Sequence, residues 1–472
     1  MKNTIADSFT GVINIGSSDS YNAFFNVNGN IVKLLPLTKE CGDTVYRLSG
    51  MDGKGQVDDS KQWLYGFTED NCSVAILKKS RLSVRLTSGY DMRTAQFYTP
   101  LIAKSTAPGK NVDLSTFDAI EFYGGIMDII HNPDQAIKWN SNTIVFTNPD
   151  NYTRKYDIEI NGEHFEVMYS ISTEGLSMDM GKLPDLRGTV HSILKFNFRS
   201  PRMLMDIEKY YSYAMSLFQF CTGRLNVCSE VRLYKKDVDR PILLRLNDGF
   251  DDYANNLNFT EVIRLGYLDE FLPRLLKLLN EDSTRPHLEF LPKRNKDVNN
   301  IMYANVNNLC IAFEIEYSRT MATSLEEERD AAKKLTEVLI EVIDKWEDCP
   351  ELVKNKARAI LNSQLKDFTP SLKEKITYIC ELYHEHVMPL TEQPGHDSLG
   401  ISTFYSSEEY QKKIAKFVKI RNSASHSKIT WNDGVDIFYH LKLYIYFSIL
   451  TRTGIPPQSI TAMLSWMFGR LF

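Results

Sequence analysis

The stretch from Tyr156 to Met168 reads YDIEINGEHFEVM and sets the character of the first part of the chain. Its two halves, Tyr156–Ile160 and His164–Met168, flank the dipeptide Asn161-Gly162. Asn-Gly is the preferred pair for a two-residue turn in which both residues have positive φ angles. The stretch therefore predicts an antiparallel β-hairpin.

The rest of the first 200 residues follows the same plan. Short runs suited to β-strands are separated by turn signals such as Asn28-Gly29 and Asp52-Gly53. The expected strands are Phe9–Ile15, Asn22–Val27, Val74–Leu77, Thr143–Phe146 and Val190–Phe198. We expect residues 1–200 to form a β-rich N-terminal domain with a sensing or regulatory role.

The pattern changes at Pro201. Met203–Thr222 is apolar at helical spacing and Gly223 suits the end of that helix. Further along, Phe259–Asn280 predicts a helix with a kink at Pro273. Two expected strands lie between these helices, Val231–Tyr234 and Ile242–Leu246. We therefore assign 201–295 to a mixed extension of the N-terminal domain.

From residue 296 the spacing is almost wholly helical. The expected helices are 301–320, 324–348, 351–366, 371–388, 406–426, 433–452 and 458–471. Thr323-Ser324 predicts the start of the second of them. The predicted class is α+β and multidomain: a β-rich N-terminal domain followed by an all-α bundle over 296–472.

Composition limits the possible functions. The 472 residues carry a net charge of −5, so an RNA site must be a local basic patch. The seven cysteines are scattered, which predicts free thiols in a reducing cytoplasm. The chain starts without an apolar signal region, and Ile437–Leu450, interrupted by His440 and Lys442, is too short to span a membrane. We expect a cytoplasmic location with no membrane partner.

Six residues at the end of the 406–426 helix suit phosphodiester chemistry: Arg421-Asn422-Ser423-Ala424-Ser425-His426. Arginine is a permanent cation that matches phosphate, and histidine transfers protons near neutral pH. Arg421 follows Phe417 and Val418 by about one turn and should continue their inward stripe. His426 lies five positions after Arg421, about a turn and a half away, so the two side chains converge only if the helix ends near Ser425 or a second subunit contributes. The alternative is a structural arginine and a surface histidine.

Lysines surround this motif more densely than an acidic chain would suggest. They are Lys412, Lys413, Lys416, Lys419 and Lys428. Such a cluster suits RNA binding, and the alternative is a solvated helix face.

Glu316 is a further candidate for the site. Leu309, Ala312, Phe313 and Glu316 fall on one helix face, so a carboxylate occupies an apolar side. It could pair with Arg421 or orient His426, or form a purely structural ion pair. The sequence shows no metal-ligand set: His384 and His386 point to different sides of a helix, so we expect no metal and no cofactor.

The chain resembles the ApeA family of bacterial anti-phage proteins, which join a β-rich domain to a C-terminal HEPN domain. The segments that carry the resemblance are Leu217–Gly223, Leu309–Glu316, Pro370–Ile376 and Phe417–His426. The last matches the HEPN signature R-N-x-x-x-H through Arg421, Asn422 and His426. The match is good over 405–430 and patchy over 1–290.

The resemblance implies an abortive-infection endoribonuclease that cleaves RNA without metal. His426 would act as general base or acid, and Arg421 would neutralise the charge on the phosphate. Asn422 would orient the phosphate or the histidine. The implied partners are RNA, with tRNA as one substrate, a second copy joined through the HEPN domain, and a phage-derived trigger. Many HEPN domains are inactive, so the alternative is a non-catalytic scaffold that binds nucleotide or RNA.

Overall fold

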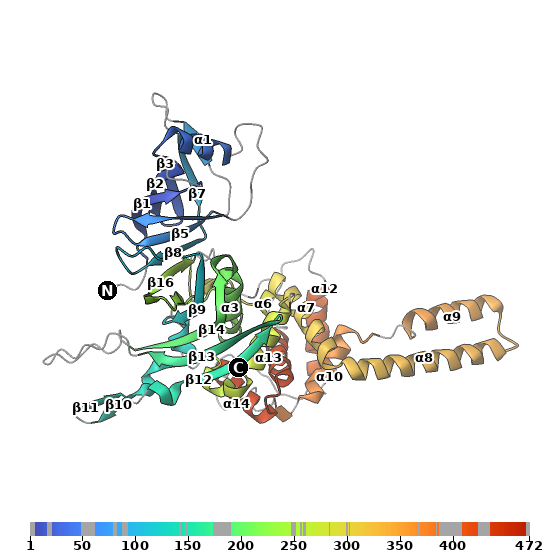
Figure 1. Cartoon of the computed structure of the whole chain (residues 1–472). Coiled ribbons are helices and arrows are strands. Elements are labelled where there is room, and N and C mark those ends of the chain that lie inside the picture. Colours follow the sequence, from blue (N-terminus) through green and yellow to red (C-terminus); the bar gives the residue numbers. More distant parts are fainter. Residues whose placement is uncertain are drawn as a thin grey trace. The chain divides into compact units, whose positions relative to one another are not determined.

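The structure, a computed structural model, describes residues 5–16, 21–48, 62–78, 83–86, 93–140, 143–146, 149–172, 190–246, 252–254, 257, 261–282, 284–298, 301, 303–365, 369–383, 385–386, 408–422 and 435–468. The chain forms two compact units (Figure 1). The β-rich unit comprises Met1–Phe259, Arg264–Glu281 and Lys293–Asn295, and the helical unit comprises Thr260–Ile263, Asp282–Pro292 and Lys296–Phe472. The predicted α+β class is confirmed. Asp282–Pro292, expected in the N-terminal extension, belongs to the helical unit.

A 14-stranded sheet, with every paired neighbour antiparallel, forms the frame of the β-rich unit. Its order is β12-β13-β14-β9-β15-β16-β8-β5-β4-β1-β2-β3-β7-β6. The strands are β1 Ser8–Asn14, β2 Asn22–Asn28, β3 Ile31–Pro36, β4 Gln62–Thr68, β5 Ser73–Lys78, β6 Ser83–Leu86, β7 Arg93–Tyr98, β8 Leu101–Ser105, β9 Thr116–Tyr123, β12 Arg154–Ile160, β13 Glu163–Ser172, β14 His191–Met203, β15 Glu230–Lys235 and β16 Val238–Leu246. β10 (Ile137–Asn140) and β11 (Thr143–Phe146) pair separately.

The hairpin expected at Asn161-Gly162 is confirmed as β12 and β13. Ile160 pairs with Glu163, so the turn contains two residues. Both have positive φ, 52° at Asn161 and 78° at Gly162, as this tight turn requires.

Helix α3 (Ile207–Thr222) packs its aromatic side against the sheet. Phe122 meets Phe218 edge-on at 5.7 Å between ring centroids, and Phe198 lies 4.5 Å from Tyr210. α3 ends at Gly223 with a φ of 64°, as predicted. The shorter helices of this unit are α1 Lys39–Leu48, α2 Ile126–Ile130, α4 Leu265–Leu268 and α5 Leu272–Glu281.

The helix expected over Phe259–Asn280, with a kink at Pro273, is wrong. α4 and α5 are separate, and Asp269 between them has a φ of 29°. Pro273 is the second residue of α5. Proline is tolerated there, because the N–H groups of the first turn of a helix need no intrahelical acceptor, so it does not kink the helix.

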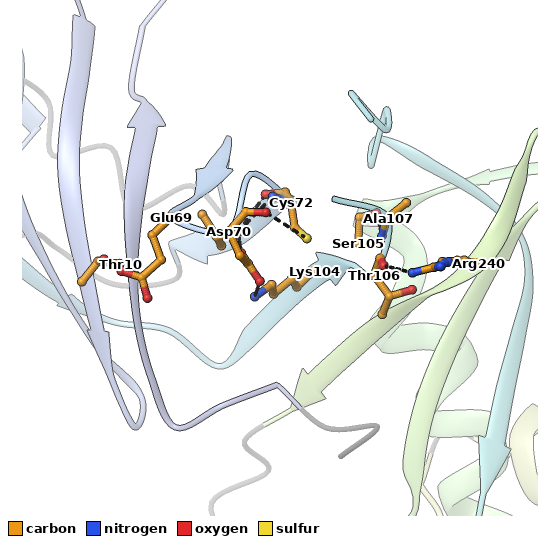
Figure 2. A network of polar contacts seen from close by, with 10 residues as sticks. Thr10, Glu69, Asp70, Cys72, Lys104, Ser105, Thr106, Ala107 and Arg240 are labelled. Carbon is orange, nitrogen blue, oxygen red and sulfur yellow. Dashed lines mark hydrogen bonds and ion pairs between the residues drawn. The ribbon is translucent and has the colours of Figure 1, made fainter. Parts of the chain in front are cut away.

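A polar network holds the β4–β5 turn beside β8 (Figure 2). Lys104 of β8 donates to Asp70 at 2.8 Å, and Thr10 of β1 donates to Glu69 at 2.5 Å. Burial tends to raise the pKa of Asp70, but the hydrogen bonds from Lys104 and Thr68 outweigh it and lower that pKa. The turn is thus tied to two strands that lie apart in sequence.

The helical unit is built around α13, which packs against α7. Its helices are α6 Pro286–Glu289, α7 Tyr303–Thr320, α8 Ala322–Lys345, α9 Glu351–Gln364, α10 Leu372–Leu382, α12 Glu408–Asn422, α13 Val435–Arg452 and α14 Pro457–Phe468. α8 begins after Met321, so Thr323-Ser324 lie within its first turn and do not cap it. The apolar stripe of α14 is core: Ile460, Met463, Leu464, Met467 and Phe468 are all buried.

Candidate active site

Helix α12 carries Arg421 on its inward side. Tyr410, Ile414 and Phe417 are buried at spacings of four and three residues, and Arg421 continues this face one turn further. The Arg421 side chain is 34% exposed, so it borders the core and still reaches solvent. The predicted inward position of Arg421 is confirmed.

Glu314 of α7 lies opposite Arg421. One Arg421 nitrogen, Nη2, is 3.9 Å from Glu314 Oε2, an ion-pair distance too long for a hydrogen bond. The other Glu314 oxygen, Oε1, accepts from Lys375 Nζ of α10 at 3.3 Å. Asn422 completes the group, since its Oδ1 accepts from Arg421 Nη1 at 3.3 Å. One carboxylate thus stands between two cations, and the trio carries one net positive charge.

Two potentially reactive groups flank Glu314 on α7. Burial raises the pKa of the Cys310 thiol to about 12, although Arg421 acts in the opposite direction. Burial, followed by the charge of Glu328, raises the pKa of Tyr317 to about 12. Both groups are therefore neutral at physiological pH, and neither is a ready nucleophile or base.

Glu316 is buried on the predicted face of α7, but it does not pair with Arg421. It contacts Arg452 of α13 at 2.6 Å and Arg319 at 2.9 Å, and its side chain is 2% exposed. Residues two positions apart on a helix are rotated by about 200° about its axis and so point to nearly opposite sides. Glu314 and Glu316 therefore face different helices. The carboxylate beside Arg421 is Glu314. The spacing of Cys310, Glu314 and Tyr317 at i, i+4 and i+7 places Glu314 on a second face of α7, but it does not show which helix that face meets.

Arg319 extends the buried network around Glu316. It contacts Asp282 at 2.7 Å. Burial tends to raise the pKa of Asp282, but hydrogen bonds from Arg319 and Thr284 lower it to about 2. Nearby, burial lowers the pKa of His287 to about 3. These ion pairs join α7 and α13 to Asp282, which precedes α6, and have a structural character.

The lysines of α12 do not lie beside Arg421. Lys412, Lys416 and Lys419 are exposed at spacings of four and three residues, so they share one face. Lys412 pairs with Glu408 at 2.7 Å, and Lys413 is half-buried. Arg421 is nine residues after Lys412, which places it about 180° around the helix. Lys412, Lys416 and Lys419 thus lie on the side of α12 away from the predicted catalytic arginine, whereas Lys413, eight residues before Arg421, lies about 80° from it.

His426 and Lys428 lie outside the described residues. Within the described part of the chain, no group of three histidine, cysteine, aspartate or glutamate side chains is placed to hold a metal ion. No helix among the described residues is long and apolar enough to cross a membrane. Comparison with protein-family models, with curated proteins and with solved structures gave no match for this chain.

Proposed function

We propose that the chain is a metal-independent endoribonuclease of bacterial anti-phage defence, with the helical unit as its HEPN nuclease domain. The observation that supports this most is the position of Arg421 and Asn422. They stand together at the last described turn of α12, with Arg421 one-third exposed in a group of net positive charge. A phosphate approaching this group would meet a guanidinium whose planar donors match its oxygens.

In the proposed reaction His426 removes the proton from a ribose 2′-hydroxyl. The 2′ oxygen attacks the adjacent phosphorus, the bond to the 5′ oxygen breaks, and the leaving 5′ oxygen takes up a proton from the protonated His426 or from water. The products are a 2′,3′-cyclic phosphate and a 5′-hydroxyl. Arg421 neutralises the charge that develops on the phosphate, and Asn422 holds the guanidinium in orientation. None of these steps requires a metal ion, because the nucleophile is the 2′-hydroxyl of the RNA itself.

The proposal includes the cellular location, the substrate, the trigger and the pairing of two copies. The protein would act in the bacterial cytoplasm during abortive infection, with tRNA as one substrate, and a phage-derived trigger would act through the β-rich unit. Two copies would pair through the HEPN domain, since a two-fold axis brings two Arg421–His426 motifs together.

The test is incubation of purified protein with total cellular RNA, followed by mapping of the new ends. Wild type is expected to produce discrete new ends, while Arg421→Ala and His426→Ala produce none. Lys155→Gln is the control, because it replaces an exposed lysine of β12, outside the helical unit, and should retain cleavage. The competing function is a non-catalytic scaffold, which is favoured if Arg421 serves only in the ion pair with Glu314. Identical RNA after incubation with wild type and both variants would establish that alternative.

A further inference from the structure

Helices α8 and α9 form a two-helix arm with an exposed apolar face. In Figure 1 they lie side by side and extend away from the other helices of their unit. Large apolar side chains along the arm stay half-exposed or more: Leu335 50%, Val338 56%, Val342 60%, Val353 54% and Ile360 53%. We call these five residues the arm face. Two further exposed apolar side chains lie at the tip of the arm, Trp346 at the end of α8 (60%) and Leu352 in the first turn of α9 (83%).

The five residues share one side of the arm. On α8, Val338 and Val342 directly precede Leu339 and Ile343, which are part-buried towards α9, and Leu335 precedes Thr336, which is 2% exposed. On α9, Val353 precedes Lys354, which is 8% exposed and donates to the Asp344 carbonyl at 3.3 Å. Consecutive residues of a helix are rotated by 100° about its axis, so each exposed residue lies 100° from the inward residue that follows it. Because α8 and α9 are antiparallel and face each other, this rotation turns the exposed residues of both helices to the same side of the arm.

The opposite side of the arm is polar and internally satisfied. Asp344 directly follows Ile343, and Asn355 directly follows Lys354. A residue that follows an inward residue is rotated in the direction opposite to one that precedes it, so Asp344 and Asn355 lie on the side of the arm away from the arm face. There Arg358 bonds Asp344 at 2.8 Å, Glu351 at 2.9 Å and Asn355 at 2.7 Å. The arm is therefore amphipathic as a pair of helices, with one side suited to water and the other not.

The apolar surface of the arm face is large enough to form the centre of a protein–protein interface. Five large apolar side chains, each half-exposed or more, form a patch on the scale of the largest apolar patch of a typical monomeric protein, roughly 300–600 Å². A stable complex buries about 800 Å² on each partner, part of it a polar rim. A two-helix layer with one apolar side is half of a four-helix bundle, and a second identical layer completes it.

Charge indicates how two arms would pack. α8 contains seven acidic and four basic residues, a net charge of −3. α9 contains one acidic and three basic residues, a net charge of +2. A two-fold axis parallel to the helices lays α8 of one copy on α9 of the other, which pairs opposite charges. An axis across the helices would instead stack α8 on α8 and repeat the same negative charge.

We propose that the arm face is a self-association surface, on which two copies of this chain form a four-helix bundle with α8 of each against α9 of the other. This deepens the proposed function, because it names the contact that joins the two copies, and none of Arg421, Asn422 and His426 takes part in it. Asp344 contacts both Lys354 and Arg358, so Val338 and Ile360 lie at similar heights along the arm. Val338 of one copy then meets Ile360 of the second.

The first test is light scattering of the full chain during size-exclusion chromatography. Wild type is expected at twice the mass of one chain. Val338→Glu is expected at half the wild-type mass, because it puts a carboxylate in the centre of the arm face. Asn362→Glu is the matched control at similar height on the polar side, and it should remain a dimer. Circular dichroism checks the fold of each variant. A wild-type monomer at tens of micromolar, or a Val338→Glu dimer, would overturn the proposal.

The second test traps the arrangement by oxidation. A full chain with Cys349→Ser, to remove the half-buried thiol at the arm tip, carries Val338→Cys and Ile360→Cys together. The proposal predicts a disulfide-linked dimer on a non-reducing gel, much stronger than with either cysteine alone. Equal cross-linking by Val338→Cys alone would indicate α8 against α8 and contradict the charge-paired packing. Absence of any cross-linked dimer would contradict the shared face.

Discussion

The guanidinium of Arg421 faces the carboxylate of Glu314 across 3.9 Å, while Lys375 holds the other oxygen of the same carboxylate at 3.3 Å. Both Arg421 and Glu314 are about one-third exposed. The pair therefore sits where solvent and an anion can reach it. Glu314 is expected to tune how strongly the arginine attracts phosphate.

Glu314→Gln should tighten RNA binding several-fold. The substitution removes a negative charge that competes with phosphate for Arg421 and Lys375, and a part-exposed ion pair contributes only about 0–1 kcal/mol to stability. Fluorescence anisotropy with a labelled single-stranded RNA at two salt concentrations measures the effect. Unchanged or weaker affinity at low salt would show that Glu314 does not oppose the anion.

Glu316→Gln should behave differently although it lies only two residues away. It leaves Arg319 and Arg452 without the buried carboxylate that both contact, and loss of one member of a buried ion pair costs about 3–5 kcal/mol. Denaturant unfolding of the full chain, with Glu314→Gln as the comparison, checks this. Equal stability of the two variants would contradict the distinction between the two carboxylates.

His287 should make the helical unit sensitive to acid. Burial lowers its folded pKa to about 3, below the ordinary value near 6.5, so the unfolded chain binds the proton first as pH falls. The stability contribution is complete above pH ~6.5 and decreases by about 1.4 kcal/mol per pH unit down to pH ~3. Thermal unfolding followed at 222 nm should show a shallower pH dependence for His287→Gln between pH 7 and 5. The exposed His164→Gln serves as control, and parallel curves for wild type and His287→Gln would refute the assignment.

The extent of the helical unit leads to a prediction about fragments. Asp282 contacts Arg319 at 2.7 Å, and Phe290 and Leu291 are buried. A fragment of residues 282–472 should fold and lose phage-dependent control, whereas 296–472 lacks these groups and should melt at lower temperature. Circular dichroism of the two fragments measures the difference. Equal melting temperatures would show that 282–292 adds nothing to the helical unit.

Much of the fold follows from local sequence. Asn161-Gly162 predicts its hairpin because the turn has a strict conformational requirement, and Gly223 predicts the end of α3 for the same reason. The order of the 14 strands could not be predicted, because pairing of strands far apart in sequence depends on tertiary contacts. The arm was also missed: periodicity places helices at α8 and α9, but it does not show that Val338 and Val342 stay exposed.

The candidate site was predicted in part. The apolar spacing of α12 placed Arg421 inward, and that spacing depends only on helix geometry. The partner of Arg421 was not predictable from that rule, since both Glu314 and Glu316 belong to α7 and only the packing of α10, α12 and α13 assigns them to different neighbours. The lysines illustrate the same limit, because their density in sequence does not show that Lys412, Lys416 and Lys419 face away from Arg421.

The most direct test of the account is cleavage of a defined RNA oligonucleotide in EDTA, next to a DNA strand of the same sequence. The account predicts that RNA is cut without metal, leaving a 2′,3′-cyclic phosphate and a 5′-hydroxyl, and that DNA survives because it lacks the 2′-hydroxyl. His426→Ala should abolish cleavage but retain RNA binding, while Arg421→Ala should weaken both. Activity lost in EDTA and restored by magnesium, or efficient cutting of the DNA strand, would contradict it.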